Sequence, residues 1–218
     1  MISKIHYISQ SRQNGSHLDA IEKVLQAGGK WIQLRVKNQS QDEILSLAIK
    51  ANALCEAHDA KLIVNDYPEI ARESGAYGLH LGLDDMPIPD ARRLVGDKMI
   101  IGGTANTFEH ILKRIEDGAD YVGLGPYRFT STKEKLSPII GSQGYRDIMR
   151  KVQHHGITVP IVAIGGIELE DIPLLLEIGL YGVAVSGALT KDAQQLVEMQ
   201  NVISSSQYKK KRHVENSR

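Results

Sequence analysis

Polar side chains occupy every second position of one short stretch of this chain, where they could bind an anion. These residues are Gln33, Arg35 and Lys37, and apolar residues separate them. Because successive side chains of a strand point to opposite faces, the three polar groups would share one face. Two cations are tolerated on a buried strand where an anionic group lies against them. A solvated edge strand is the alternative, but the tryptophan and isoleucine that precede the stretch favour burial.

Carboxylates follow two later apolar stretches. Asn65 and Asp66 end the stretch KLIVND, and Asp84 and Asp85 come shortly after the stretch GLHL. Each aspartate alone could be a turn or helix-capping residue, and the second pair does precede a proline-containing segment. Carboxylates near two cations, however, are typical of a hard-metal site with few protein ligands. We expect Mg²⁺ here, because this ion keeps several waters and bridges to substrate phosphates.

Hydroxyl groups and glycines follow three further apolar stretches and predict a second anion site. Hydroxyls and a lysine on a loop suit phosphate oxygens, and glycines at strand ends let backbone N–H groups approach a phosphate. Hydroxyl-rich loops and glycine turns are also common without a ligand, but two adjacent strand ends of this kind favour phosphate binding. The residues concerned are Thr130, Ser131, Thr132, Lys133, Gly165, Gly166, Ser186 and Gly187.

A repeated joint shows which elements must position these residues. Four times, the end of a predicted helix is closed by a glycine and followed by a short apolar strand; the glycines are Gly28, Gly75, Gly118 and Gly179. The remaining strands are predicted from similar apolar runs, typical of strands buried on both faces. The predicted strands are residues 5–9, 31–37, 61–66, 78–82, 99–104, 121–125, 160–165 and 182–186.

Helical segments alternate with these strands. The segment 40–57 has apolar residues at helical spacing, and Ser40 with Glu43 predicts a capping box at its start. Strands alternating with helices over about two hundred residues predict a compact (β/α)8 TIM barrel of one domain. A doubly wound open sheet is the alternative, but it usually has a glycine-rich turn after its first strand, and residues 9–12 contain no glycine.

Composition limits the function further. The chain has 218 residues, with 26 basic and 26 acidic residues, so net charge gives no support for a nucleic-acid or membrane partner. No stretch is long enough to span a bilayer and no signal peptide is apparent. A single cysteine excludes an intramolecular disulfide framework, and we expect a cytoplasmic protein. A homo-oligomer is compatible with the sequence, which does not fix the oligomeric state.

The C-terminal tail has a different character from the rest. Residues 204–218 include the basic run 209–212 and few apolar side chains, so we expect a disordered tail after a barrel domain of residues 1–203.

Several motifs occur together in an order that resembles the thiamine-phosphate synthase family. The motifs are QLRVK at 33–37, VNDY at 64–67, GLHLGLDD at 78–85, GLGP at 123–126 with TSTK at 130–133, PIVAIGGI at 160–167 and VAVSGAL at 183–189. The resemblance covers nearly the whole chain. It implies a (β/α)8 barrel transferase that joins 4-amino-2-methyl-5-hydroxymethylpyrimidine diphosphate to a thiazole phosphate carboxylate. The products would be thiamine phosphate, pyrophosphate and CO2.

The resemblance also implies roles for individual residues. Gln33 and Thr104 would contact the aminopyrimidine. The diphosphate would be held by Arg35, Lys37, Asn65 and Lys133, of which Arg35, Lys37 and Lys133 would be catalytic. The metal ligands for Mg²⁺ would be Asp66 and Asp85. The thiazole phosphate would be surrounded by Thr130, Thr132, Gly166, Val185 and Ser186. The chain departs from the family pattern at Tyr67, Leu83, Asn106 and Phe129.

In the implied mechanism, the pyrimidine methylene carbon loses diphosphate and the thiazole nitrogen attacks that carbon. The enzyme must mainly stabilise the departing charge and hold two substrates face to face. The alternatives are a thiazole tautomerase on the same barrel and a non-catalytic regulator that binds thiamine precursors. The tautomerase needs no diphosphate site, so Asp66 and Asp85 favour the synthase, and the retained charged residues argue against the regulator.

Overall fold

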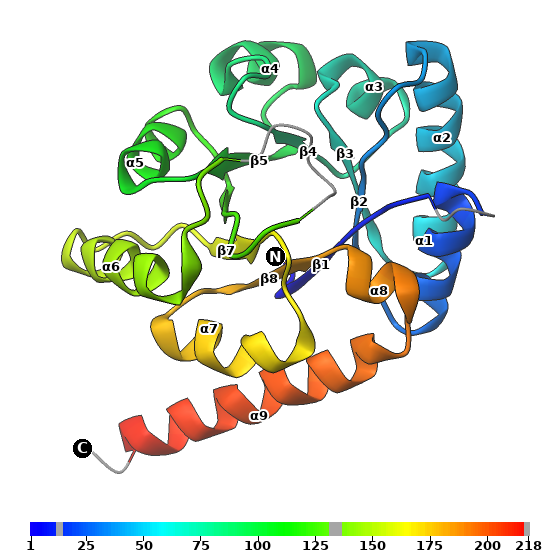
Figure 1. Ribbon diagram of the computed structural model, residues 1–218. Helices are drawn as coiled ribbons and strands as arrows, with labels where there is room; N and C mark the ends of the chain where they lie inside the picture. The colour runs from blue at the N-terminus through cyan, green and yellow to red at the C-terminus, as the bar shows by residue number, and fades with distance from the viewer. Residues whose placement is uncertain (12–14, 131–136, 216–218) are drawn as a thin grey trace.

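The computed structural model of this protein describes residues 1–11, 15–130 and 137–215, with side chains as far as residue 206. Within these residues, eight parallel strands pair in chain order, and the last pairs with the first to close a barrel (Figure 1). This confirms the (β/α)8 prediction and excludes the open sheet. The strands are β1 (Ile5–Ile8), β2 (Trp31–Leu34), β3 (Lys61–Asn65), β4 (Gly78–Leu81), β5 (Ile100–Ala105), β6 (Tyr121–Leu124), β7 (Ile161–Ile164) and β8 (Gly182–Val185).

Helices cover the outside of the barrel, as Figure 1 shows, and α9 runs beside α7 and α8. Their bounds are α1 (His17–Gln26), α2 (Gln41–Ala57), α3 (Pro68–Glu73), α4 (Ile88–Val95), α5 (Phe108–Glu116), α6 (Gly141–His154), α7 (Ile172–Ile178), α8 (Gly187–Lys191) and α9 (Gln195–Glu215), with a short 3₁₀ turn at Leu169–Asp171. Among the described residues, no helix is both long and apolar enough to cross a membrane.

Local sequence signals set these boundaries. The four joint glycines all have positive φ, between 68° and 109°, a conformation that side chains with a Cβ adopt at a cost. The predicted capping box is present at the start of α2. The Ser40 hydroxyl accepts the Glu43 N–H at 3.3 Å, and the Glu43 carboxylate accepts the Ser40 N–H at 2.8 Å. The glycines that follow helix ends and the capping box at the start of α2 therefore show that local sequence sets where these helices begin and end.

Two apolar layers hold the barrel together. The outer layer lies between the strands and the helices, and it buries residues such as Leu34, Val36 and Val185. The inner layer fills the barrel itself around Trp31 and Tyr121, whose rings meet edge to face with centroids 5.8 Å apart. A packed interior of this kind is a core rather than a channel, so the opening above it is where ligands can bind.

Strands β2 and β3 end earlier than the sequence predicts, at Leu34 and Asn65. The backbone N–H of Arg35, the residue after Leu34, donates to the Ser9 hydroxyl at 3.2 Å. It therefore does not continue the backbone hydrogen bonds between β2 and its neighbouring strand. Asp66 has φ of 72°, which is incompatible with an extended strand. The charged residues therefore lie in the loops that follow the strands.

The C-terminal segment also differs from its prediction. Helix α9 continues through residue 204, where the ordered barrel was expected to end, as far as Glu215. Lysine, arginine and glutamine are good helix formers, so a segment with few apolar residues can still extend a helix that begins on the barrel surface.

Candidate active site

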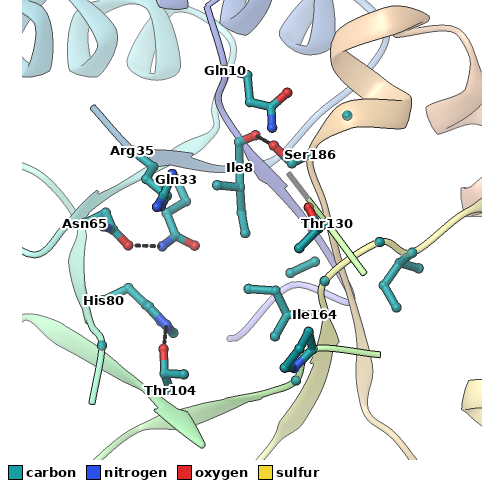
Figure 2. A pocket seen from close by; sticks show the side chains of 18 of the residues that line it. Ile8, Gln10, Gln33, Arg35, Asn65, His80, Thr104, Thr130, Ile164 and Ser186 are labelled. Carbon is teal, nitrogen blue, oxygen red and sulfur yellow. Dashed lines mark hydrogen bonds between the residues drawn. The ribbon is translucent and has the colours of Figure 1, made fainter. Parts of the chain in front are cut away.

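A cavity of about 870 Å³ opens at the carboxyl ends of the strands and is lined by residues at the ends of the strands and in the loops that follow them (Figure 2). The predicted site residues that line it are Gln33, Arg35, Lys37, Asn65, Asp66, Asp85, Thr104, Thr130, Gly166 and Ser186. Thr132 and Lys133 lie outside the described residues. Positions from distant parts of the sequence are thus brought together around one space.

The prediction for Val185 is the exception, because this residue does not belong to the described lining of the cavity. Its side chain is 1% exposed and packs in the outer core layer. Strand alternation explains the difference, since the neighbouring Ala184 and Ser186 face the cavity and Val185 must then face away.

The alternating polar residues of β2 and of the loop after it share the cavity side, as predicted. The Gln33 amide is buried and its Nε2 donates to Oδ1 of Asn65 at 2.7 Å, which fixes both side chains at the ends of β2 and β3 (Figure 2). Arg35 is half-buried beside them. An amide, a carboxamide and a guanidinium therefore face the same space, and they suit a ligand that carries both ring nitrogens and anionic oxygens.

Two carboxylates meet next to these residues. Lys37 forms an ion pair with Asp66, and Asp66 interacts with the carboxyl of Asp85. Asp85 also accepts the N–H of Gly82 at 2.6 Å, so it has the turn role that its position suggested as well as facing the cavity. Burial and then the neighbouring Asp85 raise the pKa of Asp66 to about 6, although Lys37 acts in the opposite direction.

This pair fits a hard divalent cation. The donor atoms are carboxylate oxygens, and a 2+ charge would relieve the repulsion that raises the pKa of Asp66. Among the described residues, no group of three or more histidine, cysteine, aspartate or glutamate side chains gathers to hold a metal. A metal bound by Asp66 and Asp85 would therefore take its other ligands from water and substrate, as Mg²⁺ commonly does.

Thr104 is held at the inner wall of the cavity. Its hydroxyl is 3.1 Å from Nε2 of His80 (Figure 2). Nδ1 of His80 is 3.0 Å from the hydroxyl of Tyr121. His80 is thus a buried histidine engaged on both ring nitrogens, as the strand position predicts. It fixes the Thr104 side chain from below.

The opposite wall is made of glycines and backbone. Gly165 and Gly166 have φ of 94° and 68°, and a Cβ on Gly166 would lie 2.9 Å from the carbonyl oxygen of Phe129. Arg128 donates to the Gly166 carbonyl at 3.0 Å and to Asp171 at 2.6 Å, which pins this turn. Close approach of bare backbone is the arrangement that suits a phosphate without a metal.

Ser186 completes this wall from β8. Its hydroxyl donates to the Ile8 carbonyl at 2.6 Å, so the side chain is fixed while the residue lines the cavity (Figure 2). Thr130 reaches the same side. The geometry therefore has a carboxylate half at β2–β5 and a glycine half at β6–β8.

Three of the four residues that depart from the family pattern line the cavity, and they are Leu83, Asn106 and Phe129. Asn106 donates to the Gly125 carbonyl and accepts the Ser137 hydroxyl at 2.9 Å, so it joins the ends of β5 and β6. Tyr67 instead packs against the outer core, before α3.

Sequence reasoning missed two arginines that touch site backbone, Arg128 and Arg114. Arg114 donates to the carbonyls of Thr104 and Gly82 from helix α5. The available signal was a basic residue on the apolar stripe of that helix, since Phe108, Ile111 and Arg114 are its buried positions.

Comparisons with known proteins show the family to which the chain belongs. The family model described as thiamine monophosphate synthase matches residues 5–189. A thiamine-phosphate synthase of Flavobacterium johnsoniae is 46% identical over 202 residues, which cover 93% of this chain and 95% of that protein. A thiamine-phosphate synthase of Bacteroides fragilis is 43% identical over 199 residues, covering 91% and 98%. The solved structure of a thiamine phosphate pyrophosphorylase from Pyrococcus furiosus superposes with a TM-score of 0.78 at 27% identity, covering 93% of this chain and 96% of that one.

Proposed function

This chain belongs to the thiamine monophosphate synthase family, and we propose that it forms thiamine phosphate inside the cavity at the carboxyl ends of its strands. As a transferase of thiamine biosynthesis, it would join 4-amino-2-methyl-5-hydroxymethylpyrimidine diphosphate to a thiazole phosphate and release diphosphate. Its single cysteine, which is buried, is in keeping with a cytoplasmic location.

The observation that carries the proposal is the meeting of two different anion-binding walls around one space of about 870 Å³. The carboxylate half offers Arg35, Lys37 and the aspartate pair, which suit a diphosphate with its metal. The glycine half offers backbone at Gly166, which suits a monophosphate. Two phosphorylated substrates can therefore face each other, and holding them in this way supplies much of the rate in a substitution reaction.

The carboxylate half would support departure of the diphosphate. Asp66 and Asp85 would hold Mg²⁺, which when bound neutralises charge on the diphosphate oxygens. Arg35 and Lys37 would pair with the same leaving group. Gln33, held by its hydrogen bond to Asn65, would orient the pyrimidine so that its methylene carbon faces the glycine half, and Asn65 would help to hold the diphosphate.

Bond formation needs no base, and the site agrees with this. The thiazole nitrogen attacks with its own lone pair, and both ring nitrogens of His80 are already engaged with Thr104 and Tyr121. The partly buried aspartate pair beside Lys37 favours the synthase over the thiazole tautomerase, because proton transfer on a thiazole requires no diphosphate site. A non-catalytic regulator would have little use for two adjacent carboxylates of which Asp66 is partly desolvated, an arrangement that costs free energy.

The test is incubation of the full chain with both substrates and Mg²⁺, with the product identified by mass. We expect thiamine phosphate to accumulate, with no product when either substrate is omitted or when Mg²⁺ is chelated. Isomerised thiazole carboxylate without coupling would favour the tautomerase. A folded protein that forms neither product would contradict the proposal.

A further inference from the structure

Two adjacent glycines of β5, Gly102 and Gly103, make room for large side chains on both faces of the strand. A Cβ added to Gly102 would lie 2.6 Å from Nδ1 of His80, and one added to Gly103 would lie 2.8 Å from Cδ of Arg114. Because adjacent strand positions face opposite sides, His80 occupies the barrel interior and Arg114 the outer layer. Both side chains then reach the next residue, Thr104.

Arg114 reaches the carboxyl ends of two strands from helix α5. It follows Phe108 and Ile111 on the buried face of the helix and is 7% exposed. Its Nε donates to the carbonyl oxygen of Thr104 at 3.0 Å, and its Nη2 donates to the carbonyl oxygen of Gly82 at 2.7 Å. One guanidinium therefore ties the end of β5 to the turn after β4.

Both carbonyls belong to residues of the carboxylate half. Thr104 lines the cavity, and Gly82 donates its N–H to Oδ2 of Asp85 at 2.6 Å. Burial lowers the pKa of Arg114, while the charges of Asp117 and Asp85 act in the opposite direction. Arg114 therefore holds, through the Gly82 carbonyl, the turn whose N–H binds Asp85.

We propose that Arg114 is a positioning residue for the pyrimidine diphosphate half of the cavity, which holds Thr104 and the Gly82–Asp85 turn in register without touching substrate. The inference rests on the proposed function, because it assigns this half to the pyrimidine diphosphate. The hydrogen bonds of Arg114 go to the β4 and β5 side of the barrel. Binding of the thiazole phosphate to the glycine half should therefore not depend on Arg114.

A second arginine provides a matched control. Arg92 on α4 donates to the carbonyls of Gly96 and Met99 and to Asp120, around the amino end of β5. It thus uses a guanidinium to bind backbone carbonyls as Arg114 does, but at the end of the barrel away from the cavity. Arg92→Met should cost stability and leave substrate binding unchanged.

The experiment compares Arg114→Met, Arg114→Lys and Arg92→Met with the wild-type chain. It measures Tm, the KM for each substrate, and by calorimetry the Kd of inorganic diphosphate in the presence of Mg²⁺. Arg114→Met should raise the pyrimidine diphosphate KM and the diphosphate Kd about tenfold or more, because two charge-assisted hydrogen bonds are lost. The thiazole phosphate KM should stay within about twofold. Arg114→Lys should recover part of the loss, since an ammonium lacks the two-pronged geometry.

Gly103→Ala gives an independent route to the same result if Arg114→Met does not fold. The added Cβ would displace the Arg114 side chain while the guanidinium charge remains, and the KM change should again fall on the pyrimidine diphosphate alone. An equal change in both KM values, or a lower Tm with both KM values and the diphosphate Kd unchanged, would overturn the positioning role. A wild-type chain that neither binds nor consumes pyrimidine diphosphate would instead overturn the proposed function.

Discussion

The inside of the barrel has two regions, a floor of inward-facing strand side chains and a mouth formed by the strand ends and the loops that follow them. The floor is the inner layer around His6, Trp31 and Tyr121, where the His6 and Trp31 rings stack with centroids 4.8 Å apart. The mouth is the cavity, with Asp66 and Asp85 on its wall. The side chains of the floor pack mainly against one another. The mouth instead brings charged side chains together around a space where a charged ligand could bind.

The same physical cause, burial, shifts pKa values in opposite directions in the two regions. Burial lowers the pKa of His6 to about 3, so the floor keeps this residue neutral. Burial and the adjacent Asp85 raise the pKa of Asp66 to about 6, so a carboxylate at the mouth ionises at a cost in free energy. The comparison predicts that changes at the mouth alter function with little effect on stability, and that changes at the floor do the reverse.

The largest expected effect is at the metal pair. Asp85→Asn keeps the shape of the side chain but removes one charge, and it should lower kcat roughly 100- to 1,000-fold, about 3–4 kcal/mol at the transition state. Tm should change little. Steady-state kinetics at saturating substrate, with thermal unfolding as the control, makes the measurement. Full turnover of the variant at low Mg²⁺ would remove the metal assignment.

The glycine half should respond more selectively. Ser186→Asp places a carboxylate on the wall assigned to the thiazole phosphate, and like-charge repulsion should raise the thiazole phosphate KM roughly tenfold or more. The pyrimidine diphosphate KM should stay close to that of the wild type. Ser186→Ala, which removes the hydrogen bond to Ile8 without adding charge, separates repulsion from loss of that bond. Equal increases for both substrates would mean that the two halves of the cavity do not bind separate substrates.

Metal affinity should depend on pH through Asp66. Because its pKa is raised to about 6, the carboxyl is ionised and ready for a cation above that pH and protonated below it. Affinity for Mn²⁺, read from the free ion by electron paramagnetic resonance, should fall about tenfold per pH unit below about pH 6. Asp66→Asn should bind weakly at every pH. An affinity that does not vary between pH 7.5 and pH 5 would argue against Asp66 as a ligand.

The smallest effect concerns the floor. Because the pKa of His6 falls from 6.5 to about 3 on folding, the unfolded chain takes up a proton in that range that the folded chain does not. Stability from this residue is therefore lost as pH falls, by about 1.4 kcal/mol per unit. Between pH 6 and pH 5, the free energy of unfolding should fall about 1 kcal/mol less in His6→Gln than in the wild type. Denaturant titrations at the two pH values measure this difference, and parallel losses would exclude His6 as the cause.

The sequence predicted the barrel because its signals are local. The joint glycines require positive φ, and the apolar strands are too short and continuous for helices. It also predicted the side on which Gln33, Arg35 and Lys37 lie, since alternation continues for a few residues beyond the end of β2. Local patterns were sufficient where the backbone is regular.

What the sequence could not predict depends on contacts between distant segments. Asp66 lies outside β3 because its φ is positive, which the sequence pattern does not reveal. Val185 faces the outer core layer because alternation along β8 places Ala184 and Ser186 toward the cavity. The role of Arg114 depends on the space left by Gly103 on another element, which a single helix pattern cannot reveal. Helix α9 continues past residue 204 into the segment that was expected to be a disordered tail, because good helix formers extend it there.

The most direct test of the mouth as a diphosphate site is calorimetric titration of the wild-type chain with the pyrimidine diphosphate, with and without Mg²⁺. The metal pair, Arg35 and Lys37 predict binding that strengthens markedly when Mg²⁺ is present and weakens again with chelator. The thiazole phosphate should bind without this dependence, because the glycine half offers backbone instead of carboxylates. If the pyrimidine diphosphate shows no Mg²⁺-dependent binding to the folded protein, the account of the mouth is wrong.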